Sequence, residues 1–331
     1  MPNPYISGTG FYLPPRIVTN DELSSYMDTT DEWIQERTGI KERRYVEKGV
    51  GPSDLAIPAT EQALKAAGLT VSDIDFIIFA TSTPDFYAPG SGCVLQEKMG
   101  FNEIGALDIR VQCSGFIYGL SIAEQYIRTG NFKNILLIGA EVQSTAMNLT
   151  DEGRDTAIIF GDGSGAAIIS ATEENKGILS THMHSEGKYL KELWLEAPAS
   201  NAGHPRITGE VLDEGKQYLK MNGKEVFRHA ITRFPEVINE ALEANNLTSE
   251  NINLLIPHQA NLRITQMVQK RLGLSNDQVF SNIHKYGNTT AATIPIALAE
   301  AFNEGRIKEG DILVLAAFGA GFTWASAIMK W

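Results

Sequence analysis

Two kinds of segment alternate along the chain. Short, continuous apolar stretches such as "IDFIIFA", "ILLIGAE", "INLLIP" and "DILVLAAFG" are typical of strands that are buried on both faces of an α/β sheet. Longer stretches between them, such as "SGFIYGLSIAEQYIRTG", carry apolar residues at helical spacing. The pattern therefore predicts an α/β protein in which helices cover largely buried sheets.

One helix–turn–strand unit occurs twice. The segment "ALKAAGLTVSDIDFIIFAT" at 63–81 resembles "ALEANNLTSENINLLIPHQ" at 241–259, so that Ala63 corresponds to Ala241. Two more pairs follow in the same order, "YIRTGNFKNILLIGAE" with "AFNEGRIKEGDILVLAAFG" and "FGDGSGAAIIS" with "FGAGFTWASAIMK". The order predicts two duplicated α/β halves, residues 1–170 and 171–331. The segment 188–215 is rich in charge, Gly and Pro, and we expect a surface insertion there.

Composition narrows the class of protein. The 331 residues are 43% hydrophobic and 21% charged, which is ordinary for a globular domain. No apolar run approaches the ~18 residues of a membrane span, no secretory signal is visible, and two cysteines give no disulfide framework, so we expect a cytoplasmic protein. The net charge of −12 argues against nucleic-acid binding, and an acidic partner would need a local basic patch.

Candidate chemistry follows the predicted strands, where sites of α/β sheets gather. Cys113 stands at the start of a predicted helix, whose dipole and free amides are expected to lower its pKa and make it a nucleophile for thioesters. The alternative is a buried cysteine that acts as a small hydrophobe. His258 follows "LLIP" and is suited to donate to an oxyanion or enolate, unless it is a structural histidine.

Two further features complete this set. Asn288 in "KYGNTTAATIP" offers an amide donor, although Asn is also an ordinary helix N-cap. The turn at 319–321 can present backbone N–H groups as an oxyanion hole, or it is simply a tight turn. The separation of Cys113 and Asn288 along the chain is close to that of the two repeat copies, so a pseudo-twofold axis is expected to bring their loops together.

These residues carry a resemblance to a known family. The segments "QCSGF", "PHQANLRI", "GNTTAA" and "AFGAGFTW", together with "TTDEWIQERTGI" and "FGDGSGAA", resemble β-ketoacyl-acyl carrier protein synthase III, the initiating condensing enzyme of type II fatty-acid synthesis. The resemblance runs nearly from end to end. It implies the thiolase fold, in which two βαβαβαββ halves form a five-layered αβαβα sandwich.

The resemblance also implies a reaction and roles for residues. Cys113 would accept an acyl group from a coenzyme A thioester. His258 and Asn288 would bind the malonyl thioester carbonyl and stabilise the enolate that forms as carbon dioxide leaves. The backbone amides of Cys113 and Ala320 would hold the oxyanion. Decarboxylation supplies the carbon nucleophile, so neither a metal nor a cofactor is expected.

The resemblance implies two binding surfaces and a homodimer. Trp33, Arg37 and Arg154 would contact coenzyme A, whereas the residues alone read as a solvated surface helix. The acidic acyl carrier protein would meet basic residues on two predicted helices, with ordinary solvated helix faces as the alternative. These basic residues are Arg263, Lys270 and Arg271 on one helix and Lys224 and Arg228 on the other.

The acyl pocket departs from the family pattern. Ala88 stands where family members carry a bulky Phe that closes the pocket of the partner subunit, so we expect primers longer than acetyl. Phe86 or Tyr87 could fill the space instead.

Two departures flank the nucleophile and the oxyanion turn. Arg110 precedes Cys113 where small apolar residues are usual, and we favour an ion pair with Glu141 over binding of a substrate carboxylate. Ala320 replaces a glycine, which narrows the allowed φ.

Three other functions remain open at this stage: a relative in specialised metabolism that uses a longer or unusual acyl group, a thioester hydrolase that uses Cys, His and Asn, and a catalytically silent subunit. His182 and His184 lie on one strand face, but no acidic or cysteine cluster accompanies them, so no metal site is expected.

Overall fold

Two β-sheets form the framework of the computed structural model, which describes residues 1–331. The first sheet has the order β1-β7-β6-β4-β5, and the second has the order β11-β12-β13-β8. Strand β4 runs parallel to β5 and β6, and β11 runs parallel to β12, whereas the other pairs are antiparallel. The strands are β1 Asn3–Tyr12, β4 Phe76–Ala80, β5 Gly105–Ile109, β6 Asn134–Glu141, β7 Gly163–Thr172, β8 Gly177–Ser185, β11 Leu254–Pro257, β12 Ile312–Gly319 and β13 Thr323–Lys330.

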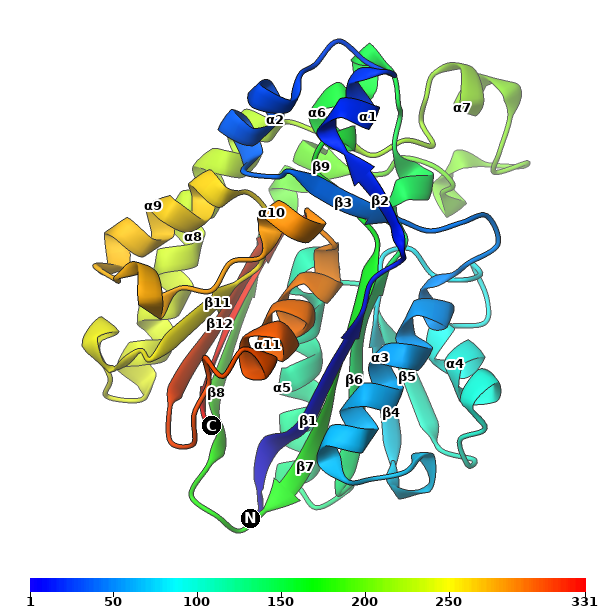
Figure 1. Cartoon of the computed structure of the whole chain (residues 1–331). Coiled ribbons are helices and arrows are strands. Elements are labelled where there is room, and N and C mark those ends of the chain that lie inside the picture. Colours follow the sequence, from blue (N-terminus) through cyan, green and yellow to red (C-terminus); the bar gives the residue numbers. More distant parts are fainter.

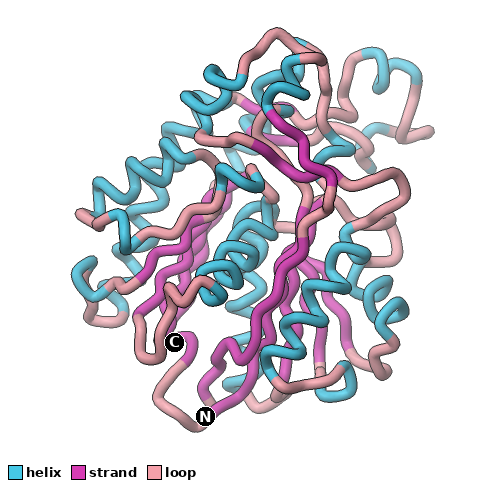
Figure 2. Tube along the Cα trace, in the orientation of Figure 1, coloured by secondary structure: helices cyan, strands magenta, loops and turns pink.

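Helices cover both outer faces and fill the space between the sheets (Figures 1 and 2). Helices α5 (Gly115–Arg128) and α11 (Thr293–Asn303) lie between the sheets, and the largest buried apolar cluster surrounds them. Helices α3 (Pro52–Ala67) and α4 (Ser91–Met99) pack on the first sheet, while α8 (Gly223–Ala244) and α9 (Leu262–Leu272) pack on the second. The predicted αβαβα sandwich is confirmed.

Smaller elements form a cap at one end of the sandwich, at the top of Figure 1. The cap and its connections contain β2 Arg16–Thr19, α1 Asn20–Ser24, α2 Asp31–Thr38, β3 Glu42–Tyr45, α6 Arg154–Ala157, β9 Leu193–Trp194, α7 Gly209–Asp213, β10 Lys220–Met221 and α10 Ile283–Tyr286. Short 3-10 helices occur at η1 Val71–Asp73, η2 Gln112–Ser114, η3 Gln143–Ala146, η4 Asp151–Gly153, η5 Gly187–Glu192, η6 Ser200–Ala202, η7 Ser249–Asn251, η8 Asn276–Gln278 and η9 Thr290–Ala292. No helix combines the length and the apolar character that a membrane crossing requires.

The duplicated sequence segments adopt the same local structure in both halves. Asp75, which precedes β4, accepts a hydrogen bond from the backbone N–H of Asn134 at 2.9 Å. Asn253, which precedes β11, accepts one from the N–H of Ile312 at 2.8 Å. The offset that aligns the two repeat copies also aligns Asp75 with Asn253 and Asn134 with Ile312. The same polar contact therefore joins equivalent strands in the two halves.

The second half is a reduced copy of the first. The place of an edge strand equivalent to β5 is taken by a single bridge, in which Val279 pairs with Leu255. The chain leaves the first sheet at the end of β7 and enters the second at β8, on either side of a turn at 173–176. The division at 170/171 remains a prediction.

Candidate active site

The loop that carries the nucleophile is built by packing across the two halves. Helix η2 from the first half packs against β12 of the second, and η9 from the second half packs against β6 of the first. Each 3-10 helix begins with a residue other than glycine at positive φ, Gln112 at 44° and Thr290 at 52°, and the repeat offset aligns these two residues. This backbone conformation is costly for such residues and is kept only where the surroundings enforce it. The pseudo-twofold relation thus brings Cys113 next to the end of β12.

Cys113 is buried at the bottom of this arrangement, with 4% of its surface exposed. Burial raises the pKa of its thiol to about 12, and the negative charge of Glu141 adds to the rise, while the backbone N–H groups of Ala320 and Cys113 act in the opposite direction. The prediction that the helix start lowers this pKa is therefore wrong, because burial outweighs the favourable amides. The resting sulfur is a thiol, and it needs a base when it attacks.

Gly319 forms the wall directly against the sulfur. A Cβ atom at this position would lie 2.5 Å from Cys113 Cβ and 2.7 Å from its Sγ, so only glycine fits. Ala320, the next residue, is not among the residues with positive φ, so the narrower φ range of alanine causes no strain there. The backbone N–H of Ala320 contacts the sulfur, as the predicted oxyanion turn requires.

His258 lies at the carboxyl end of β11, where its backbone N–H donates to Ala316 at 2.8 Å. Its Nδ1 lies 2.6 Å from Thr293 Oγ1, and its Nε2 is buried without a hydrogen-bond partner. Burial lowers the pKa of His258 to about 3, so the ring is neutral. Buried polar atoms in proteins normally have a hydrogen-bond partner, so this unpaired nitrogen is available to a substrate.

Thr293 controls which ring nitrogen of His258 carries the hydrogen. Its hydroxyl lies 3.0 Å from the carbonyl oxygen of Thr290 as well as 2.6 Å from Nδ1. When the hydroxyl donates to Thr290, it accepts from Nδ1–H, and Nε2 is a proton acceptor. When it turns to donate to Nδ1, Nε2 carries the hydrogen and is a donor. The site therefore supports both forms of the neutral ring.

Asn288 is held by the other half of the molecule. Its backbone N–H donates to Ile159 at 2.9 Å, and its carbonyl accepts from Gly161 at 3.0 Å. Its side-chain Oδ1 accepts from the N–H of Thr290 at 2.8 Å, which turns the amide nitrogen away from that turn. Asn288 also lines the same cavity as Cys113 and His258, so it both shapes the turn and offers an N–H donor to a ligand.

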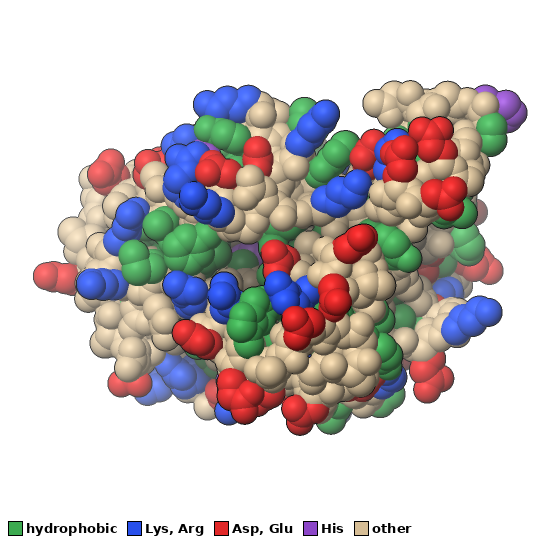
Figure 3. Space-filling view, turned by 90° about the horizontal axis from the view of Figure 1, so that it is seen from above, with side chains coloured by type: hydrophobic (Ala, Val, Ile, Leu, Met, Phe, Trp, Pro, Cys, Tyr) green, Lys and Arg blue, Asp and Glu red, His purple; other side chains and the backbone are tan.

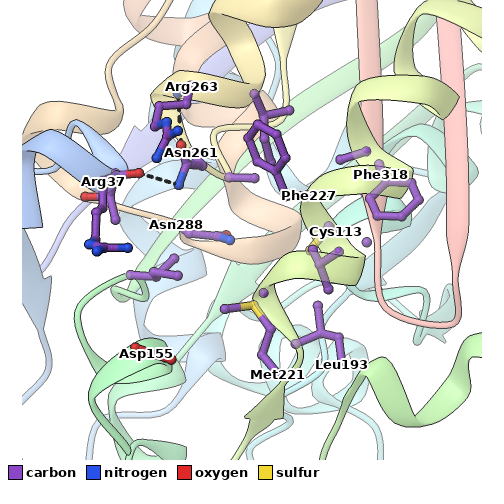
Figure 4. A pocket seen from close by; sticks show the side chains of 18 of the residues that line it. Arg37, Cys113, Asp155, Leu193, Met221, Phe227, Asn261, Arg263, Asn288 and Phe318 are labelled. Carbon is purple, nitrogen blue, oxygen red and sulfur yellow. Dashed lines mark hydrogen bonds between the residues drawn. The ribbon is translucent and has the colours of Figure 1, made fainter.

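A cavity of about 690 Å³ connects these three side chains to the surface (Figure 4). Trp33 and Arg37 line its mouth, and the guanidinium groups of Arg37 and Arg154 lie 4.4 and 4.8 Å from the centre of the Trp33 ring. Asn261 joins the two helices at the mouth, because its Nδ2 donates to the carbonyl of Arg37 at 2.9 Å. The structure thus brings the predicted coenzyme A residues together at the entrance.

The predicted basic residues fall into two groups. Arg263 and Lys224 line the first cavity. Figure 3 shows Lys and Arg side chains that gather beside a hollow on the upper face of the molecule. Lys270 lies two turns further along α9, about 10 Å away. Arg271 donates to the carbonyl of Ile231 at 2.5 Å, and Arg228 is engaged by Glu225 at 2.5 Å. The lining of the cavity does not include Lys270, Arg271 or Arg228.

A second cavity of about 480 Å³ meets the first at Cys113. Arg110 lines it and forms no salt bridge, whereas Glu141 accepts hydrogen bonds from Thr83 Oγ1 at 2.8 Å and from Ser82 Oγ at 2.9 Å. The favoured Arg110–Glu141 ion pair is therefore wrong. Burial raises the pKa of Glu141 to about 7, and neighbouring hydroxyl groups rather than a cation satisfy its oxygens.

The loop that carries the predicted gate lies on the surface of the chain. Ala88 is exposed, and the exposed fractions of Phe86 and Tyr87 are 59% and 64%. Tyr87 lines the second cavity of its own chain, where its hydroxyl pairs with Ser200 Oγ at 3.1 Å. Phe86 does not line that cavity, so it does not fill the space left by Ala88 within one chain.

Sequence reasoning missed three contributors to the site. Thr293 gave no signal beyond its place one turn into a predicted helix. Gln143 Nε2 donates to Thr290 Oγ1 at 2.9 Å, and nothing in the sequence signalled this role. The segment 188–215 has no clear periodicity, yet it supplies one wall of the second cavity, through Leu190, Leu193, Trp194, Leu195, Pro198, Ala199 and Ser200. The predicted surface insertion is thus part of the site. Of the two discounted histidines, His182 and His184, each contacts Glu240.

The duplicated five-layered sandwich, with a buried thiol reached by a neutral imidazole and an amide, defines the class of condensing acyltransferases with the thiolase fold. Comparison with known proteins narrows this class. The family model described as "3-Oxoacyl-[acyl-carrier-protein (ACP)] synthase III" matches residues 107–187, and the model for the C-terminal part of the same family matches residues 242–331.

Relatives and solved structures agree with these matches. The β-ketoacyl-[acyl-carrier-protein] synthase III of Caldanaerobacter subterraneus subsp. tengcongensis is 47% identical over 98% of this chain and 97% of that protein. The crystal structure of 3-oxoacyl-[acyl-carrier-protein] synthase III from Aquifex aeolicus has a TM-score of 0.90 and 40% identity, and covers 99% of this chain and 100% of that one. The priming β-ketosynthase of the R1128 polyketide pathway has a TM-score of 0.91 and 29% identity, over 99% and 96% of the two chains. The chain belongs to the 3-oxoacyl-[acyl-carrier-protein] synthase III family.

Proposed function

We propose that this condensing enzyme takes an acyl group from a coenzyme A thioester onto Cys113 and joins it to a malonyl group on acyl carrier protein. The products are 3-oxoacyl carrier protein, carbon dioxide and coenzyme A. One observation carries the proposal: the thiol of Cys113, the unpaired Nε2 of His258 and the free amide of Asn288 line one cavity. Decarboxylation supplies the carbon nucleophile, so we propose no metal and no cofactor.

The first half of the reaction loads the thiol. The Cys113 proton moves to His258 Nε2, in the form of the ring that accepts, while the sulfur attacks the thioester carbonyl. The new C–S bond forms a tetrahedral oxyanion, which accepts hydrogen bonds from the backbone N–H groups of Cys113 and Ala320. The C–S bond to coenzyme A then breaks, and the departing thiolate takes the proton from His258. A thiol with a raised pKa makes this base necessary.

The second half makes the carbon–carbon bond. The malonyl thioester carbonyl accepts from the Asn288 amide and from His258 Nε2, now in its donor form with Thr293 donating to Nδ1. The bond to the malonyl carboxylate breaks, carbon dioxide leaves, and the electron pair becomes the enolate. The enolate carbon attacks the acyl carbonyl, the bond to Cys113 breaks, and the sulfur regains a proton from solvent.

The first cavity is proposed as the path for both thioesters. Trp33, Arg37 and Arg154 offer planar groups on which the adenine of coenzyme A can stack, in place of one of the guanidinium groups that now cover the indole. Arg263 and Lys224 are placed to attract the acidic carrier protein at the same mouth. Lys270, Arg271 and Arg228 lie outside the cavity lining, and we assign them at most to the periphery of that surface.

We also propose a homodimer in which each subunit's loop at 84–90 covers the acyl pocket of the other. Strand β5 is one of the two edges of the first sheet, and Ala88 lies on the neighbouring exposed loop. An edge strand with free N–H and C=O groups is suited to pair with its own copy. Because Ala88 is small, we expect the completed pocket to admit primers longer than acetyl.

A priming enzyme of specialised metabolism is the second candidate. The polar side chains that line the second cavity, among them Arg110 and Gln143, favour an unusual acyl group over a plain hydrocarbon. The membership of the family favours an acyltransferase over a thioester hydrolase, and the presence of Cys113, His258 and Asn288 argues against a silent subunit.

Intact-protein mass spectrometry after incubation with acyl-CoAs of two to twelve carbons tests the proposal. We expect a mass increase equal to the acyl group that is lost in the Cys113→Ser variant and that transfers when malonyl carrier protein is added. Acetyl-CoA as the best donor would overturn the expectation for primer length. Labelling of Cys113 without condensation would overturn the carrier-protein step, and the lack of any adduct would overturn the coenzyme A donor.

A further inference from the structure

The second cavity is unusual because its two walls differ in chemistry. The apolar wall comes from the segment 190–199 and from Leu219. Another part of the lining forms a polar wall. Within this wall Gln143 Nε2 donates hydrogen bonds to Ser82 Oγ and to Thr290 Oγ1, both at 2.9 Å. The residues of this polar wall are Ser82, Thr83, Gln112, Gln143 and Thr290, and the cavity is also lined by Tyr87, Arg110 and Ser200. A plain alkyl chain would pack against the apolar wall but would form no hydrogen bonds with the polar wall.

Arg110 is the one charged side chain that lines this cavity, and neither Asp nor Glu accompanies it. It follows the edge strand β5, is exposed, and makes no hydrogen bond or salt bridge within the chain. The buried acid Glu141 is already satisfied by Ser82 and Thr83. No group of the same chain therefore engages the guanidinium of Arg110, which leaves its N–H donors available to a ligand in the second cavity.

The rim of the second cavity carries a second positive charge, that of Arg206. Arg206 lies 4.6 Å from the centre of the Tyr87 ring, and the Tyr87 hydroxyl is held by Ser200. Arg110 and Arg206 both favour the ionised form of that phenol and lower its pKa, after the larger effect of the Ser200 hydrogen bond. The electrostatic potential at this rim is thus suited to an anion.

We propose that the acyl group transferred by this enzyme carries a carboxylate at its far end, and that Arg110 binds this carboxylate. The inference rests on the proposed function, in which Cys113 holds the acyl group at the inner end of the second cavity. The guanidinium fork matches the two oxygens of a carboxylate. The methylene groups between the thioester and the carboxylate would lie on the apolar wall, and the polar wall would hydrogen-bond the bound anion and its water.

Matched pairs of donors test the inference. Single-turnover acylation of Cys113 is followed by intact-protein mass spectrometry with succinyl-, glutaryl- and adipoyl-CoA against butanoyl-, pentanoyl- and hexanoyl-CoA. We expect at least one dicarboxylic donor to react faster than its alkyl partner. In Arg110→Gln the ratio of the two rates should fall roughly tenfold, the loss of one charge-assisted hydrogen-bonded pair. In Arg110→Lys it should fall less.

The control is Arg206→Gln, which removes the same charge from the same rim outside the cavity lining and should lower the ratio much less. An equal fall in that variant would overturn the assignment to Arg110, because a general field would explain it. An alkyl donor preferred at all three lengths, with Cys113 labelled, would overturn the carboxylate while leaving the proposed function intact. No labelling by any donor would instead count against the proposed function. If Arg110→Gln dissociates the oligomer in light scattering and keeps the donor ratio, Arg110 is an interface residue and the inference fails.

Discussion

At the scale of single residues, the surroundings of Cys113 decide its reactivity. A cysteine next to a helix start has favourable amides nearby, yet full burial and the neighbouring Glu141 raise its pKa to about 12. The chemistry therefore depends on a partner that can take the proton while the sulfur attacks. His258 offers the unpaired Nε2 of a neutral ring, and because burial lowers its pKa to about 3, the proton rests there only during the reaction.

The pH dependence of alkylation checks the state of this thiol. Iodoacetamide reacts with the thiolate, and below pH 12 the thiolate fraction of Cys113 rises about tenfold for each pH unit. We expect the Cys113 rate, measured by peptide mass spectrometry, to rise in this way from pH 7 to 9. Glu141→Gln removes a negative charge, lowers the pKa and should raise the rate at pH 8. A plateau below pH 9 in the unaltered protein would show that the thiol ionises easily. The exposed Cys93 in the same digest reports reagent access.

The close contact between Gly319 and Cys113 leads to a steric prediction. In Gly319→Ala the new Cβ would lie 2.7 Å from the Cys113 sulfur, and displacement of that sulfur should slow acylation by about 100-fold. Gly187→Ala is the matched control, because a Cβ there meets nothing within 4 Å. Circular dichroism should show that both variants fold. Acylation of Gly319→Ala at the normal rate would mean that the close contact does not constrain the nucleophile.

At the scale of elements, α2 shows how local signals place a binding residue. The helix begins at a Thr30 cap, whose Oγ1 accepts from the backbone N–H of Trp33 at 3.1 Å. It ends at Gly39, whose φ of 77° allows the left-handed turn, and a Cβ there would strike Leu262 of α9. The Thr30 cap and Gly39 thus fix the two ends of α2 beside α9, and this places Trp33 at the mouth of the first cavity.

Removal of the cap should therefore affect both stability and binding. Thr30→Ala is expected to lower the free energy of unfolding by about 1 kcal/mol and to raise KM for acyl-CoA more than it changes kcat. Denaturant unfolding and steady-state kinetics measure the two effects. Thr29→Ala is the matched control, because Thr29 Oγ1 is buried without a hydrogen bond and its loss should cost little. Equal effects of the two variants would argue that the cap does not position Trp33.

At the scale of the whole molecule, the duplication makes one site rather than two. Helices η2 and η9 occupy equivalent places, but Cys113 stands in the first and Ala291 stands at the corresponding position of the second. The free edge of β5 has no counterpart in the second sheet, where one bridge at Val279 replaces that strand. The asymmetry leaves one nucleophile, and it leaves β5 as an edge strand that has no equivalent in the second sheet.

The oligomeric state tests the proposed use of that edge. Leu107 lies half-buried on β5, and Leu107→Asp places a charge in the proposed contact, so we expect the dimer to dissociate in light scattering. Leu179→Asp is the matched control, because Leu179 is an exposed apolar residue on β8, the edge strand of the other sheet. A dimer that survives Leu107→Asp and dissociates with Leu179→Asp would place the contact on the second sheet.

The sequence by itself determined the alternation of strands and helices and the duplication, because these follow from local patterns, while the five layers and the roles of Cys113, His258 and Asn288 were implied by the family resemblance. Apolar runs and helical spacing each act over a few residues. Cys113 and His258 follow the strands β5 and β11, whereas Asn288, which was also predicted to follow a strand, follows the short helix α10. The tertiary structure alone decided the pKa of Cys113, the free guanidinium of Arg110 and the partner of His258. Burial, charge separation and packing across the two halves set these properties, and they depend on residues far apart in the chain, such as 113 with 319 and 258 with 293.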